Sequence, residues 1–170
     1  TDPAGGAIPI AGSTTTGLQE FVNAVASTGF PGRAIGSGVA ANGVCPGPFV
    51  LESTLSVPPM MGTQIDVSGT ITIEDFPHNL VSGISFDTLA RCKFHHHGII
   101  NLLGGDAFGA ITFKPSTEYS ANAYFPWQRN EINSSSIRLG NINAMSGDFN
   151  ALVKFACESA SINNNDIEIG

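Results

Sequence analysis

The residues with the clearest capacity for binding chemistry are aromatic and lie close together in the chain. Tyr119, Tyr124 and Trp127 include both tyrosines and the single tryptophan, and Arg129 follows them. Aromatic rings have apolar faces that stack on sugar rings, and an arginine beside them binds hydroxyl or carboxylate groups. This cluster predicts a carbohydrate-binding site. Tyrosine and tryptophan are also enriched in subunit interfaces, so an interface or plain packing stays open as an alternative.

Acidic residues offer a second kind of chemistry. Glycoside hydrolysis needs two carboxyl groups about 5–10 Å apart, one of them with a raised pKa. Asp87 and Glu131 are the catalytic candidates, and Asp106 and Glu118 lie in the same strand and loop region. Nothing in the spacing selects a pair, and solvated turn carboxylates are the simpler interpretation.

The histidine run offers a third kind of chemistry. In a strand, His95 and His97 project from one face, a spacing that chelates zinc. No cysteine or acid close by in the sequence completes the coordination sphere, so a polar strand face without metal is favoured and no cofactor is predicted.

A lyase site would need a base beside a group that neutralises a uronate carboxylate, for which Lys93 beside the histidines, or Arg129 beside Tyr124, is available. The sequence contains no acidic Ca²⁺-binding cluster to accompany them.

One helix is expected among the elements that must position these residues. Residues 18–28 carry an apolar stripe at helical spacing, with a capping box from Thr16 to Gln19 before it and Gly29 as its stop. The stripe consists of Leu18, Phe21, Val22 and Val25. Residues 1–16 form a linker-like entry without periodicity.

Short strands are expected from residue 49 onward, because apolar residues recur in pairs with period two between turn residues. The pairs are Phe49/Leu51, Leu55/Val57, Ile65/Val67, Ile71/Ile73, Ile84/Phe86, Ile111/Phe113, Ile137/Leu139, Val153/Phe155 and Ile167/Ile169. The absence of a second helical pattern excludes a doubly wound α/β sheet. Small polar loops, rather than hairpin dipeptides, follow most strands, which favours a single all-β solenoid domain over 17–170 with the helix as its cap. A β-sandwich is the alternative.

Several stretches resemble known β-helical proteins. Residues 18–26, 47–58 and 66–73 resemble the cap helix, first strand with its turn, and first complete coil of pectate-lyase-like right-handed β-helices. Residues 83–94 and 130–137 resemble coils of bacteriophage tailspikes and tail fibres.

The resemblance implies a right-handed parallel β-helix acting as a structural and host-recognition module of a virion tail. Such a module binds host surface polysaccharide, forms a homotrimer and contacts other virion tail proteins. The same resemblance keeps a polysaccharide-degrading enzyme, hydrolase or lyase, as the alternative function.

Composition narrows the partners and the compartment. Charged residues are only 12% and the net charge is −7 without a basic run, which predicts no nucleic-acid partner. No apolar run is long enough to span a bilayer, so no membrane insertion is expected. Cys45, Cys92 and Cys157 suggest buried thiols in a protein made in a reducing compartment. The resemblance to virion tail proteins implies that this compartment is the bacterial cytoplasm and that the final location is the virion tail, with secretion as the alternative. Because residue 170 follows a strand directly without a closing cap, we expect a longer β-helix or an end covered by a partner.

Overall fold

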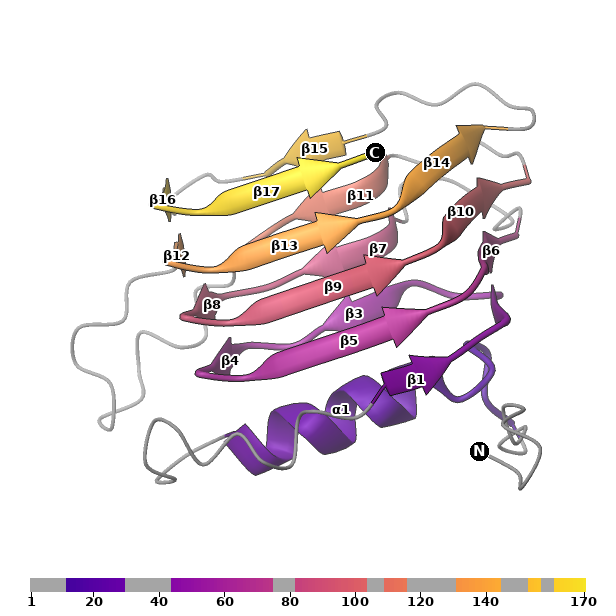
Figure 1. Cartoon of the computed structure of the whole chain (residues 1–170), viewed down its shortest axis with the longest axis horizontal. Helices are drawn as coiled ribbons and strands as arrows, with labels where there is room; N and C mark the ends of the chain where they lie inside the picture. Colours follow the sequence, from indigo (N-terminus) through magenta and orange to yellow (C-terminus); the bar gives the residue numbers. More distant parts are fainter. Residues whose placement is uncertain are drawn as a thin grey trace.

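A computed structural model describes residues 12–29, 44–74, 82–103, 109–115, 131–144, 153–156 and 161–170. Within these residues the chain forms one helix, α1 (Leu18–Gly29), and otherwise short strands (Figure 1). The strands are β1 (Val44–Pro46), β2 (Phe49–Leu51), β3 (Leu55–Val57), β4 (Met60–Met61), β5 (Gln64–Ser68), β6 (Ile71–Ile73), β7 (Ser82–Phe86), β8 (Leu89–Ala90), β9 (Lys93–His97), β10 (Ile99–Leu102), β11 (Gly109–Phe113), β12 (Glu131–Asn133), β13 (Ser136–Leu139), β14 (Asn141–Ala144), β15 (Val153–Phe155), β16 (Ser161–Asn163) and β17 (Asp166–Ile169).

Each strand from β1 to β13 pairs in parallel with the strand that comes four places later in the chain. The four resulting sheets have the orders β1-β5-β9-β13-β17, β2-β6-β10-β14, β3-β7-β11-β15 and β4-β8-β12-β16. The chain therefore visits the four sheets in turn and adds one strand to each on every pass. The expectation of a mostly β protein with one helix and parallel sheets is confirmed for the described residues. Parallel pairing also differs from the antiparallel pairing that defines a β-sandwich.

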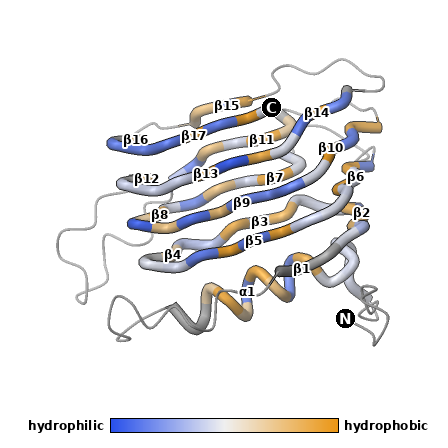
Figure 2. Tube along the Cα trace, in the orientation of Figure 1, coloured by the Kyte–Doolittle hydropathy of each residue, from blue (hydrophilic) through white to orange (hydrophobic). Residues whose placement is uncertain are grey.

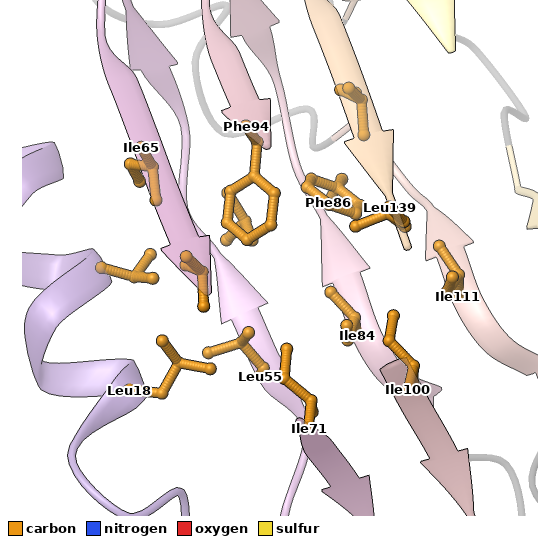
Figure 3. Close-up of a cluster of buried hydrophobic side chains, with 14 of the residues drawn as sticks. Leu18, Leu55, Ile65, Ile71, Ile84, Phe86, Phe94, Ile100, Ile111 and Leu139 are labelled. Atoms are coloured by element: carbon orange, nitrogen blue, oxygen red, sulfur yellow. The ribbon is translucent and has the colours of Figure 1, made fainter. Parts of the chain in front are cut away.

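Helix α1 lies at the end of the stack beside the earliest strands and contacts β3 and β4 (Figure 1). Leu18, Val22 and Val25 of its apolar stripe are buried as predicted, and Phe21 is partly buried. Figure 3 shows Leu18 beside Leu55 of β3. Burial of this stripe against the first strands covers apolar surface that would otherwise face water, which explains why a single short helix is stable here.

The predicted capping box is wrong in its residues. The Thr15 hydroxyl, rather than Thr16, accepts a hydrogen bond from the backbone N–H of Gln19 (3.0 Å). The Thr16 hydroxyl instead bonds both the N–H and the carbonyl of Val50 in β2. The Gln19 side chain reaches forward to the backbone of Ser56 in β3 rather than back to the cap. These side chains bind the helix to two sheets, so they are engaged in tertiary hydrogen bonds rather than in the predicted capping box.

The core is built from columns of like residues, because parallel register places equivalent side chains above one another. The buried rings of Phe86 and Phe113 stack with centroids 5.2 Å apart, and the exposed ring of Phe155 in the next strand of the sheet stacks on Phe113 at 5.0 Å. Phe94 of β9 meets Phe86 edge-on across the core, from the opposite sheet. Alternation of apolar and polar residues along the strands is visible in Figure 2, and the inward side chains meet in Figure 3.

Two corners of the repeat are formed by recurring backbone features that the sequence pattern did not predict. Glycine follows every strand of the five-stranded sheet, at Gly47, Gly69, Gly98, Gly140 and Gly170. A Cβ at Gly140 would collide with the Gly98 carbonyl, and one at Gly98 would collide with the Gly69 carbonyl. The opposite corner carries left-handed residues before β5, β9, β13 and β17, at Gly62, Arg91, Ser134 and Asn164. Because the corner residues lack a Cβ, the backbones of successive passes can approach closely at the corner. The strands on either side of it therefore stay within hydrogen-bonding distance of the equivalent strands in the next pass.

Candidate functional site: a polar sheet face and its histidine cluster

The predicted carbohydrate-binding residues fall in one connection of the repeat. Tyr119, Tyr124, Trp127 and Arg129 lie outside the described residues, in the sequence between β11 and β12. Asp106 and Glu118 also lie outside them. Their candidate roles therefore stay predictions.

The two candidate catalytic acids lie on neighbouring passes of the chain. The register pairs Leu89 of β8 with Ile132 of β12, so Glu131 stands one position before this pair, beside Thr88. Asp87 is the residue before Thr88, and its half-buried carboxylate accepts hydrogen bonds from the Thr88 N–H (2.7 Å) and hydroxyl (3.3 Å). The backbone thus brings the two acids to the same edge of the fold, although the sequence separates them widely.

The outward side of the five-stranded sheet forms a continuous polar face. Strands β5, β9, β13 and β17 alternate inward and outward residues, and every outward position on them is polar or charged. The polar face consists of Gln64, Asp66, Ser68, Lys93, His95, His97, Ser136, Arg138, Asp166 and Glu168. Among the described residues, it gathers hydrogen-bonding and charged side chains into parallel rows across four passes of the chain.

A histidine cluster occupies the centre of the polar face. Register pairs Asp66 with His95, and Ser68 with His97, between β5 and β9. The Oδ1 atom of Asp66 lies 3.9 Å from Nδ1 of His95 and 3.9 Å from Nε2 of His97. The two imidazole rings stand nearly perpendicular, with centroids 6.2 Å apart. The prediction that His95 and His97 share a face is confirmed, and the acid that sequence proximity failed to reveal is Asp66 on the neighbouring strand.

Neighbouring groups fix the orientation of this cluster. Gln64 donates from Nε2 to Oδ2 of Asp66 (2.8 Å), and the Ser136 hydroxyl lies 3.0 Å from Nε2 of His95. Partial burial lowers the pKa of His95; Asp66 opposes this shift, and Arg138 and His97 add to it. His95 is therefore a neutral imidazole near neutral pH, with a lone pair available as a ligand or a hydrogen-bond acceptor.

Further along the polar face, an exposed charge pair continues the rows. Arg138 donates from Nη2 to Oδ2 of Asp166 (2.8 Å), and its Nε lies 3.6 Å from the Glu168 carboxylate. This hydrogen bond and charge lower the pKa of Asp166 and raise that of Arg138. Because both partners are exposed, the pair shapes the charge of the surface more than it stabilises the fold.

The third histidine of the run faces the interior. His96 is buried, and its Nε2 lies 2.7 Å from the carbonyl of Gly69 at the glycine corner. Its Nδ1 has no hydrogen-bond partner among the described residues, and burial lowers its pKa. His96 therefore acts as a neutral donor that ties β9 to the corner, and it is separated from the cluster of its two neighbours.

The prediction of buried thiols is confirmed for Cys92. Cys92 is buried at the corner before β9, and burial raises the pKa of its thiol to about 11. Such a thiol is inert at neutral pH. Cys157 lies outside the described residues.

Comparison of the chain with protein-family models, curated proteins and solved structures gives no match. Among the described residues, no helix has the length and apolar character needed to cross a membrane.

Proposed function

We propose that the chain is a right-handed parallel β-helix that acts as a structural and host-recognition module of a virus tail fibre or tailspike. In this proposal the chain binds host cell-surface polysaccharide and forms a homotrimer. The trimer contacts other virion tail proteins, and the chain is made in a reducing bacterial cytoplasm. The observation that carries the proposal is the four-strand parallel repeat with α1 at its first pass. This is the arrangement that the resemblance to tailspikes and pectate-lyase-like β-helices implies.

The connection between β11 and β12 supports polysaccharide as the ligand. Connections between rigid strands are where folds of this kind place binding residues, since they vary without disturbing the core. This connection contains Tyr119, Tyr124, Trp127 and Arg129, a combination suited to stacking on sugar rings and bonding their polar groups. The low charge of the whole chain suits lateral packing of identical copies, which supports the trimer.

A polysaccharide-degrading enzyme on the same fold is the second candidate. The β8–β12 register favours it, because Asp87 and Glu131 come from neighbouring passes of the chain. A retaining or inverting glycosidase requires two carboxyl groups at about 5–10 Å, and the backbones of adjacent passes in a parallel stack lie about 4.8 Å apart. The proposal of a binding module therefore needs a test that reports binding and cleavage separately.

The test incubates the purified chain with bacterial surface polysaccharides and measures binding by calorimetry, new reducing ends, and absorbance from new double bonds. Binding without either product supports the recognition module. Reducing ends that disappear in Asp87→Asn or Glu131→Gln support the hydrolase instead. Absorbance from new double bonds supports a lyase. Absence of both binding and products for every polysaccharide would overturn the proposal in both forms.

A further inference from the structure

Three side chains on the polar face offer metal-ligand atoms to a single point. The carboxylate of Asp66 and one nitrogen each of His95 and His97 all lie within 4.8 Å of one another. We propose that Asp66, His95 and His97 form a binding site for one divalent transition-metal ion, with zinc as the expected ion. The site belongs to the folded chain itself and does not depend on polysaccharide binding.

The donor set selects the class of ion. Two imidazoles and one carboxylate are a known protein ligand set for zinc, with a fourth position left for water or another ligand. Calcium and magnesium prefer oxygen ligands alone, so a set with two nitrogens disfavours them. The chemistry of these three groups therefore fits a borderline transition metal rather than an alkaline-earth ion.

The geometry is close to what coordination requires. Zinc bonds of about 2.0–2.1 Å in a tetrahedral arrangement place neighbouring ligand atoms about 3.3 Å apart. Both separations from Asp66 are 3.9 Å, so modest side-chain rotation brings the atoms together. His97 has room for this movement, because its side chain is 67% exposed, whereas His95 and Asp66 are held at 19% and 21%. At 3.9 Å the groups face one another without hydrogen bonds between them.

The surrounding hydrogen bonds engage the other polar atoms of Asp66 and His95 and leave their ligand atoms directed toward each other. Gln64 occupies Oδ2 of Asp66, which leaves Oδ1 directed to the histidines. Ser136 occupies Nε2 of His95, which leaves Nδ1 directed to Asp66. Outer partners of this kind fix the tautomer and the ring orientation of ligating histidines. Two hydrogen-bonded strands carry the three ligands, so their backbone spacing is set before any ion arrives.

The test is a calorimetric titration of the chelator-treated full chain with zinc chloride. One ion per chain is expected, and His97→Ala and Asp66→Asn should each weaken binding more than about 100-fold. That loss exceeds the 10–100-fold typical of outer-shell changes. The matched control is Glu168→Gln, which removes an exposed carboxylate from the same polar face and should leave the zinc affinity unchanged. Circular dichroism of each variant confirms that it is folded.

A second measurement on the unaltered chain guards against variants that fail to fold. Addition of Co²⁺ should shift the ring-proton resonances of both His95 and His97 in nuclear magnetic resonance spectra. Absence of zinc binding to the unaltered chain would overturn the proposal. So would an affinity that persists in both His97→Ala and Asp66→Asn, or Co²⁺ shifts confined to other histidines.

Discussion

Replacement of Gly98 by alanine should destabilise the fold strongly, because this residue lies in the most crowded column of the backbone. Gly98 follows β9 with a φ of +157°, a conformation that side chains rarely adopt. An added Cβ would collide with the carbonyl oxygen of Gly69 and lie 2.7 Å from its carbonyl carbon. Both obstacles are backbone atoms, which cannot rotate away as a flexible side chain would.

The expected loss has two parts. Overpacking against a rigid neighbour costs about 1–3 kcal/mol, and a strained backbone conformation adds about 1–3 kcal/mol. Together they predict a loss of about 4 kcal/mol in the free energy of unfolding, a large share of the 5–15 kcal/mol that is typical of a domain.

Urea unfolding followed by circular dichroism measures this loss, with Gly12→Ala as the matched control. Gly12 also has a positive φ, +81°, but nothing lies within 4 Å of an added Cβ. Its replacement should therefore cost only the backbone part, about 1–2 kcal/mol. Equal unfolding midpoints for the two variants would refute the account of a closely packed glycine corner.

Three further predictions concern the buried residues. Leu18→Ala should lower the free energy of unfolding by about 2–5 kcal/mol, because it leaves a cavity under α1; a loss below about 1 kcal/mol in urea unfolding would contradict the packing of this helix. Because burial lowers the pKa of His96, the unfolded chain binds this proton first, so stability should fall as the pH drops from about 7 through the ordinary value of 6.5. The His96→Phe variant should lose less of its unfolding free energy over this range. An unchanged slope of unfolding free energy against pH in this variant would contradict the assigned role of His96. Cys92, with its thiol pKa raised to about 11, should resist iodoacetamide in the native chain and react after unfolding in urea, as judged by mass spectrometry of its peptide; equal labelling rates would show that the site is open.

Much of the strand pattern was predictable from the sequence. Every apolar pair predicted from residue 49 onward lies in a strand, because period-two alternation marks a strand with one inward face. These pairs are buried except in β15 and β17, where the apolar residues are partly buried or exposed. The predicted pairs missed strands β1, β4, β8, β10, β12, β14 and β16. Strands β4 and β8 have only two residues each, which is too short to show a period. Strand β9 was only partly recognised, as a polar face, because its outward lysine and histidines obscure its apolar alternation.

The repeat and the histidine cluster needed three-dimensional information. The corner glycines recur at unequal intervals, since connections of different length separate the strands, so no fixed period marks them in the sequence. The histidine run predicted a shared face for His95 and His97, but its third ligand is contributed by the preceding pass of the chain. Only the β5–β9 register places Asp66 beside His95.

The central claim, recognition of surface polysaccharide through the residues between β11 and β12, is tested most directly by the affinity of the Trp127→Ala variant. The measurement is calorimetric titration with the polysaccharide that binds the unaltered chain most tightly. Phe155→Ala is the control, since it removes an aromatic ring that is 55% exposed in β15. We expect Trp127→Ala to lose at least about tenfold in affinity, equivalent to about 1.4 kcal/mol, while Phe155→Ala keeps the affinity of the unaltered chain. Equal affinities for Trp127→Ala and the unaltered chain, with both folded, would contradict the claim.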